Sequence, residues 1–104
     1  MQERSPRSDP DRQEPADRIA ALVLAVPGVA DLHGGMFGEV ATYLPGRRLL
    51  GIALTEQSCA VHISVTYPAN VVDVAEAVRR AVTSAVAVPV NVTVEDVQLE
   101  RTAQ

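Results

Sequence analysis

The residues best suited to chemistry gather in one short segment, where His33 is followed by Gly34 and Gly35. An imidazole titrates near neutral pH, so a histidine in a turn is a candidate general base. A base also needs a partner that orients it and a pocket for its substrate. His62 is the only other histidine, and nothing in the sequence spacing brings the two together. We expect no catalytic residue here, and expect the glycines to allow positive φ angles in a helix-to-strand connection.

The residues from Gly35 to Gly38 match G-x-x-G, the loop with which KH domains clamp an RNA backbone. In KH domains this loop joins two helices and usually carries basic residues, whereas here its middle residues are Met36 and Phe37. RNA binding through Gly35 to Gly38 is therefore the alternative function, not the leading one. Two large apolar side chains between glycines are either an exposed anchor for a protein partner or a cap on the open end of the core.

Two arginines and one cysteine are the remaining candidates. Arg47 and Arg48 follow Pro-Gly, so they are expected in a hairpin turn, where they meet solvent or an anionic partner. Cys59 stands alone, which excludes an intramolecular disulfide and a cysteine zinc site, and its expected role is a small buried side chain. No catalytic, cofactor or metal residues are expected. The candidate partner-contact residues are His33, Gly34, Gly35, Met36, Phe37, Arg47 and Arg48.

Composition excludes several classes of protein. The 104 residues are 47% hydrophobic but include one Phe, two Tyr and no Trp, so the core should be aliphatic. The formal net charge is -4, and all nine basic residues are arginine, which indicates a GC-rich coding genome. An acidic chain with few aromatic rings argues against nucleic-acid binding. No apolar stretch approaches the roughly 20 residues that span a bilayer, so a place at the membrane requires a partner.

The hydrophobic pattern predicts the elements that position these residues. Charges and prolines fill residues 1–16, which we expect to form a disordered N-terminal tail, and a single domain is expected over 17–100. Apolar residues at helical spacing predict a helix from Asp17 to the Pro-Gly pair at 27–28. Alternating apolar residues predict strands over 40–44 and 50–54, paired as a hairpin through a turn at 45–48.

The second half of the chain gives clearer signals. Strict alternation over 61–67 predicts a strand that is buried on one face. Asn70 is expected to cap an amphipathic helix that runs to Val86. Pro89 ends that helix region, and the valines that follow predict a last strand whose apolar phase slips by one, which indicates a bulge near Glu95 and Asp96.

These elements predict an α+β fold with two layers, in the order helix, strand, strand, strand, helix, strand. The sheet should be mainly antiparallel with four strands, and the two helices should pack on one of its faces. The long second helix should cross over to place the last strand.

Three segments give the chain a resemblance to the alkaline shock protein family of envelope stress response proteins, also called the Gls-type general stress family. They are residues 26–40 with their V-P-G-V-A-D-L-H-G-G run, residues 61–75 and residues 90–97. Their order and spacing carry the resemblance over residues 17–99, and the all-arginine composition indicates an actinobacterial-type member.

The resemblance implies a non-enzymatic cytoplasmic protein that needs no cofactor and supports cell envelope homeostasis through protein binding. It implies a membrane-associated position at the inner face of the cell membrane, held by an integral-membrane partner of the same family. It also implies self-association into oligomers. The family has no catalytic residues to transfer to this sequence.

Overall fold

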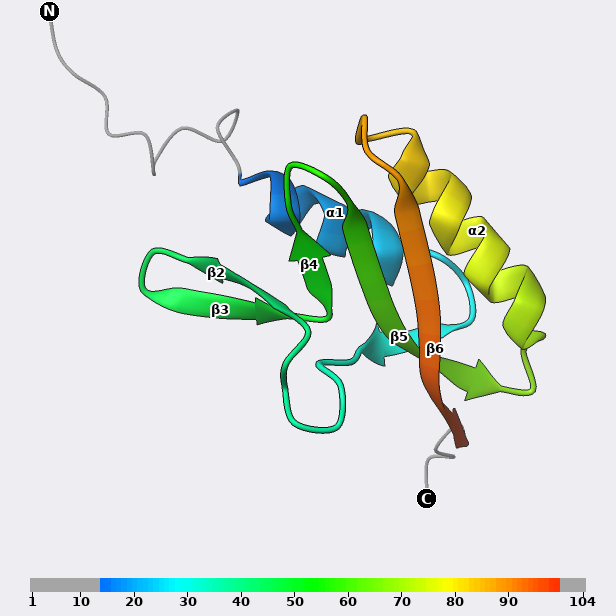
Figure 1. Ribbon diagram of the computed structural model, residues 1–104. Coiled ribbons are helices and arrows are strands. Elements are labelled where there is room, and N and C mark those ends of the chain that lie inside the picture. Colours follow the sequence, from blue (N-terminus) through cyan, green and yellow to red (C-terminus); the bar gives the residue numbers. More distant parts are fainter. Residues whose placement is uncertain (1–13, 100–104) are drawn as a thin grey trace, which may run out of the picture.

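The computed structural model describes residues 14–99, which form two helices and six strands (Figure 1). The α+β class and the mainly antiparallel four-stranded sheet predicted from the sequence are confirmed. The expected tail lies outside the described residues for its first 13 positions. The elements in chain order are α1 (Pro15–Leu24), β1 (Val29–Leu32), β2 (Ala41–Leu44), β3 (Arg47–Leu50), β4 (Ile52–Leu54), β5 (Cys59–Tyr67), α2 (Val71–Thr83) and β6 (Val90–Leu99).

β5 is the central strand and pairs with three others. β1 and β4 both run antiparallel to it along one edge, β1 against residues 63–65 and β4 against residues 59–61. β6 runs parallel to β5 along the other edge for the full length of β5. Parallel neighbours need a crossover connection, which α2 provides. Every strand of this sheet therefore depends on β5 for its hydrogen bonds.

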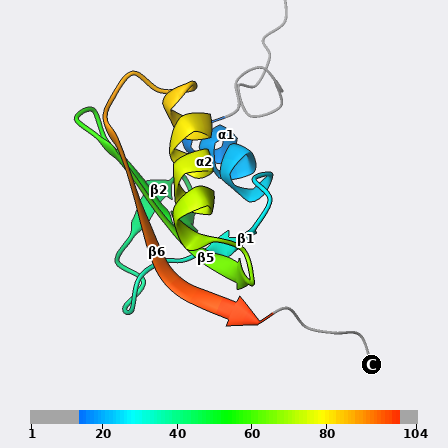
Figure 2. The same cartoon turned by 90° about the vertical axis from the view of Figure 1, so that its right-hand side faces the viewer.

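One aliphatic core joins both helices to β5. Its fully buried side chains include Ile19 of α1, Ile63 of β5 and Val78 of α2. Figure 2 shows α1 and α2 side by side, on the same side of β5 and β6. The alternation of residues 61–67 explains this arrangement, because its odd-numbered side chains from Val61 to Val65 all enter the core.

The helix ends follow local sequence signals, with two corrections. α1 begins at Pro15, two residues before the expected start at Asp17, since proline is well suited to the first turn of a helix. Ala16 is buried against the core, so the last two residues assigned to the tail belong to the helix. Asn70 caps α2 as predicted, its Oδ1 accepting the backbone N–H of Asp73 at 3.0 Å. α2 ends at Thr83, three residues before Val86.

The predicted hairpin between residues 40–44 and 50–54 is wrong. β2 pairs instead with β3 through a two-residue connection, so Arg47 and Arg48 lie in a strand and not in a turn. Gly51 has a φ of +91° and ends β3, after which β4 turns away to pair with β5. The sequence pattern does not reveal this break, because the alternation of residues continues through Gly51. The positive φ of Gly51 changes the direction of the chain without changing that pattern.

The strand β1 was not expected, because residues 29–32 were interpreted as part of a helix-to-strand connection. The sequence V-A-D-L is short and does not alternate clearly, so its own pattern carries no strand signal. Its pairing comes entirely from β5, more than 30 residues further along the chain.

The predicted bulge in β6 is confirmed. Ile63 faces Val94 and Ser64 faces Asp96, which leaves Glu95 as the extra residue. Without a bulge, consecutive residues would point to opposite faces of the sheet. Here Glu95 and Asp96 lie next to each other along the groove, and Glu95 bonds to the ring of His62 on β5.

Candidate partner-binding site at the glycine loop

The glycine loop, residues 33–40, joins β1 to β2 and projects beyond the strands that it connects (Figure 1). The expectation that this segment connects a helix to a strand is therefore wrong. The loop also differs from a KH loop, which joins two helices. It contains five of the seven candidate contact residues, and Arg47 and Arg48 lie outside it on β3.

Internal hydrogen bonds set the shape of the glycine loop. Gly35 has a φ of +87°, as expected for this turn, whereas Gly34 does not have a positive φ. The positive φ favours glycine at this position, and an added Cβ would also lie 2.5 Å from Oε2 of Glu39, whose side chain would have to move. The bonds are Gly35 N to His33 Nδ1 at 3.0 Å, Phe37 N to Glu39 Oε1 at 3.0 Å, Gly38 N to Gly35 O at 3.2 Å and Val40 N to Gly34 O at 2.9 Å.

Met36 and Phe37 are fully presented to solvent at the tip of this loop. Their exposed fractions are 82% and 86%, the highest of the large hydrophobic residues in the part of the chain that the structure describes. The interpretation in which they cap the open end of the core is therefore wrong. The tip offers two large apolar side chains on a backbone that is already hydrogen-bonded.

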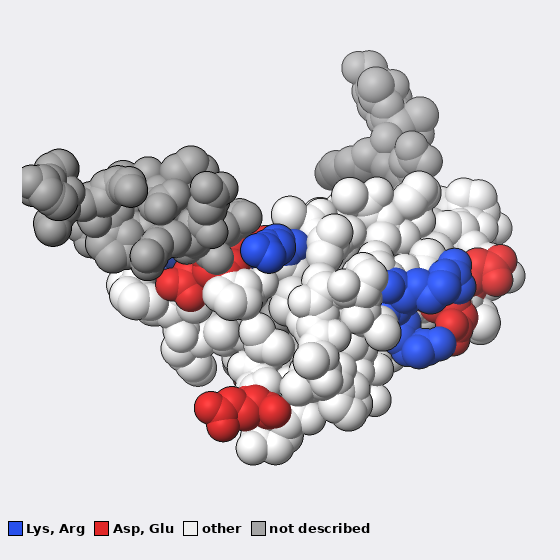
Figure 3. All heavy atoms as spheres, turned by 90° about the horizontal axis from the view of Figure 1, so that it is seen from above, with Lys and Arg blue, Asp and Glu red and all other residues white. Residues whose placement is uncertain are grey.

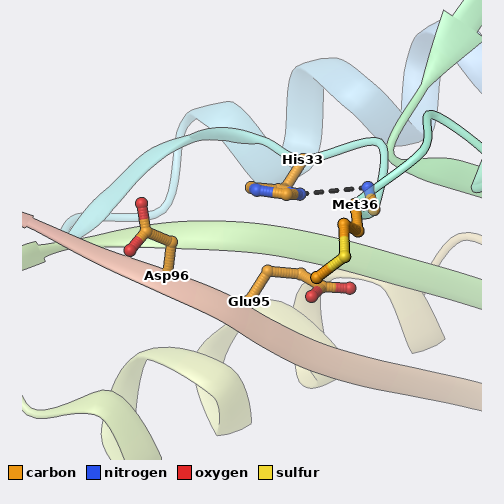
Figure 4. A pocket seen from close by; sticks show the side chains of 5 residues that line it. His33, Met36, Glu95 and Asp96 are labelled. Atoms are coloured by element: carbon orange, nitrogen blue, oxygen red, sulfur yellow. Dashed lines mark hydrogen bonds between the residues drawn. The ribbon is translucent and has the colours of Figure 1, made fainter.

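A shallow groove of about 450 Å³ lies beside this tip. Figure 4 shows His33 and Met36 on the loop side of the groove, with Glu95 and Asp96 extending toward it from β6. Gly35 completes its lining. The groove therefore combines one apolar side chain, one imidazole and two carboxyl groups.

The two histidines are neighbours, although nothing in the sequence spacing indicated it. The His33 backbone N–H donates to the His62 carbonyl at 2.9 Å, because β1 pairs with β5 just beyond this point. The His62 ring bonds through Nδ1 to Oε2 of Glu95. Sequence reasoning missed Glu39 and the His62–Glu95 pair, and only the register of β6 against β5 would have revealed the latter.

This geometry does not favour His33 as a general base. Its Nδ1 accepts the Gly35 N–H, so the proton of the neutral ring lies on Nε2 and the ring has no free lone pair. A general base needs a free lone pair that faces its substrate. The five residues that line the groove also supply no hydroxyl, thiol or amine nucleophile.

The arginines of the described residues do not form a basic surface near the loop. Arg47 donates to both carboxylate oxygens of Asp17, at 3.1 and 2.6 Å, so it joins β3 to α1. Arg79 donates to Glu76 within α2. On the face shown in Figure 3, the blue atoms have red atoms beside them, and most of the described surface is neither blue nor red. Phosphate backbones are bound by continuous basic surfaces.

The remaining candidates are structural. Cys59 is fully buried, as expected, and burial raises the pKa of its thiol. Over residues 14–99, no group of three His, Cys, Asp or Glu side chains is arranged to hold a metal ion. Neither α1 nor α2 has the length and apolar character needed to cross a bilayer.

Acidification is expected to release the Phe37 amide from Glu39. The backbone N–H groups of Glu39 itself and of Phe37 hold the pKa of the Glu39 carboxyl below its ordinary value, and His62 and His33 act in the same direction. A lowered pKa means that the carboxylate stabilises the loop at higher pH and that this contribution is lost as pH falls through the lowered pKa. The Phe37 amide resonance, followed by NMR, should shift with a midpoint below that of an ordinary glutamate.

The matched control for this titration is Glu39→Gln, which keeps the shape of the side chain but cannot titrate in this range. It should abolish the acidic shift of the Phe37 resonance. A wild-type Phe37 resonance that stays constant over the acidic range would contradict the assigned hydrogen bond.

Together, the fold and the site define a small α+β domain that presents a hydrogen-bonded loop with an apolar tip beside a groove that contains two carboxyl groups. Comparison of the chain with models of protein families, with curated proteins and with solved structures finds no match. The resemblance to the alkaline shock protein family therefore stays a prediction.

Proposed function

We propose that this chain is a non-enzymatic interaction protein that supports the cell envelope under stress. It binds a protein partner through Met36 and Phe37, self-associates, and is held at the cytoplasmic face of the membrane by that partner. The role in the envelope and the membrane partner rest on the resemblance to the alkaline shock protein family. The mode of binding rests on the glycine loop.

The exposure of Met36 and Phe37 is the observation that carries the proposal. Burying a side chain of either type stabilises a complex by roughly 1.5 to 3 kcal/mol. Large apolar side chains that stay exposed in a folded domain commonly mark an interaction site. The hydrogen bonds inside the loop reduce the entropy lost on binding, because the backbone of the tip is already ordered.

The acidic surroundings of the loop support a protein partner over RNA. Glu39 bonds to the loop itself, and Glu95 and Asp96 line the adjacent groove. Carboxylates repel a phosphate backbone, and only one arginine, Arg48, is found beside Gly38, its Nη1 lying 4.0 Å from an added Cβ on that glycine. The RNA-binding alternative therefore lacks the charge that it requires.

Cross-linking of the full chain in its native cell, followed by mass spectrometry, tests the proposal. Met36→Ser with Phe37→Ser should weaken partner binding about a hundredfold, since two apolar contacts are lost. The matched control is Tyr43→Ser with Val72→Ser, which removes two other highly exposed apolar side chains from β2 and α2. This control should leave the cross-links unchanged.

Three outcomes would count against the proposal. Cross-links that survive the loop variant would remove Met36 and Phe37 from the interface. Recovery of soluble partners alone would remove the membrane role. Titration of labelled RNA at two salt concentrations tests the alternative, because an affinity that falls as salt rises would favour RNA binding.

A further inference from the structure

The outer edge of β6 is a second interaction surface, independent of the glycine loop. Within residues 14–99, β6 pairs with β5 and with no other strand, and it is the last strand on its side of the sheet (Figure 1). It is ten residues long, so it presents an extended row of backbone groups. We propose that a second copy of this chain pairs antiparallel with β6 about Val92, and so joins the two sheets into one. This inference rests on the self-association proposed above and names its surface.

The ladder to β5 determines which backbone groups of β6 are free for a partner. Cys59 donates its N–H to the Pro89 carbonyl at 2.9 Å, and Cys59 lies opposite Val90. In a parallel ladder alternate residues bond to the neighbouring strand, so Asn91 and Thr93 direct their N–H and C=O groups toward β5. Val90, Val92 and Val94 therefore direct theirs outward.

The side chains of this edge carry none of the devices that keep an edge strand from pairing. Residues 90–94 read V-N-V-T-V, with no charge and no proline. Monomeric proteins usually protect such edges with lysine, proline, a bulge or a covering segment. Here Pro89 and the bulge at Glu95 stand on either side of the five residues and leave them regular.

A two-fold axis at Val92 is the register that pairs these five residues entirely with themselves. Val92 faces its own copy, Val90 faces the partner's Val94, and Asn91 faces the partner's Thr93. All three outward-facing residues then meet outward-facing residues, as an antiparallel ladder requires. The half-buried valines of the two edges, which pack against the core in each copy, form one continuous row.

Charge selects the same register. With the axis at Val92, Glu95 lies opposite the partner's Pro89, and the two copies of Glu95 are six residues apart along the strands. At about 3.3 Å per residue this separation is roughly 20 Å, about twice the screening length in physiological salt. An axis at Glu95 would instead bring four carboxylates together. The acidic pair at the bulge therefore limits the contact to residues 90–94.

Amide hydrogen exchange, read by NMR on the full chain, tests the surface directly. At high protein concentration the N–H groups of Val90, Val92 and Val94 should exchange slowly, and dilution should make them exchange quickly. The N–H groups of Asn91 and Thr93 bond to β5 and should stay protected at both concentrations, which provides an internal control. Light scattering on the same samples should show a dimer that dissociates on dilution.

Two double variants test the register, because both change only exposed side chains. Asn91→Lys with Thr93→Glu places opposite charges face to face across the two-fold axis. Asn91→Glu with Thr93→Glu places like charges there. The second variant should dissociate at least about tenfold more readily than the first, and circular dichroism should show that both are folded.

The outcomes separate this inference from the proposed function. A chain that stays monomeric at all concentrations overturns self-association and the β6 contact together, but leaves partner binding by Met36 and Phe37 intact. A dimer in which both variants associate equally overturns the β6 contact alone. Protected Val90, Val92 and Val94 amides in a monomer would mean that something other than a second copy covers the edge, which also overturns it.

Discussion

Replacing Gly51 with alanine should lower the free energy of unfolding by about 3 kcal/mol. The residue is buried and has a φ of +91°, a conformation that costs an L-residue roughly 1 to 2 kcal/mol. An added Cβ would lie 2.7 Å from the Cβ of Leu32, 3.0 Å from the His33 nitrogen and 3.2 Å from the His62 carbonyl. Two of these three atoms belong to the backbone, so they cannot move away without disturbing the strands. Overpacking therefore adds about 1 to 3 kcal/mol to the loss of stability.

Gly46→Ala is the matched control for this substitution. Gly46 also has a positive φ, of +73°, but no atom lies within 4 Å of an added Cβ. Gly46→Ala should lower the free energy of unfolding only by the cost of holding alanine at a positive φ, about 1 to 2 kcal/mol. Urea denaturation followed by circular dichroism measures both variants. Equal losses would mean that contact with Leu32, His33 and His62 contributes nothing at Gly51.

Ile63→Ala should have an effect of similar size, about 2 to 5 kcal/mol. Ile63 is fully buried at the middle of β5, where it lies opposite Leu32 of β1 and Val94 of β6. Truncation removes its apolar contacts and leaves a cavity between the helices and the sheet, since neighbouring strands cannot close around it. Domains of this size are stable by only about 5 to 15 kcal/mol, so much of the margin would be lost.

The control for the core substitution is Val72→Ala on α2. Val72 is 68% exposed, so truncation there should change stability by less than about 0.5 kcal/mol. Thermal unfolding of the two variants at one protein concentration compares them. An Ile63→Ala variant as stable as Val72→Ala would contradict the position assigned to Ile63 at the centre of the core.

The second half of the fold could be predicted from the sequence because its signals are local. Alternation over 61–67, the Asn70 cap and the phase slip at Glu95 each occur within a few residues. The structure has the strand, the cap and the bulge, although Ser64 is buried too, so burial of the strand is not confined to one face. The first half depends on distant partners. β1 pairs only with β5, and at Gly51 the chain leaves its pairing with β2 and begins to pair with β5, a distant partner that no local pattern encodes.

The candidate site divides in the same way. The exposure of Met36 and Phe37 follows from two large side chains between glycines, so the sequence indicated it. The neighbourhood of His33 and His62 and the bond from His62 to Glu95 depend on the register of β1 and β6 against β5. Arg47 was assigned to a turn because Pro-Gly precedes it, whereas it pairs with Leu44 in the ladder between β2 and β3 and its side chain bonds to Asp17.

The central place of β5 also determines when the chain can fold during synthesis. β1 and β4 lie on one edge of β5 and precede it in the sequence, so neither has a partner in the sheet until residues 59–67 have left the ribosome. β6 comes last and adds the other edge. Until then the apolar residues of α1, β1 and β4 lack the central strand that covers them, although β2 and β3 can already pair with each other, and we expect the core to form in a single late event that β5 permits and β6 completes.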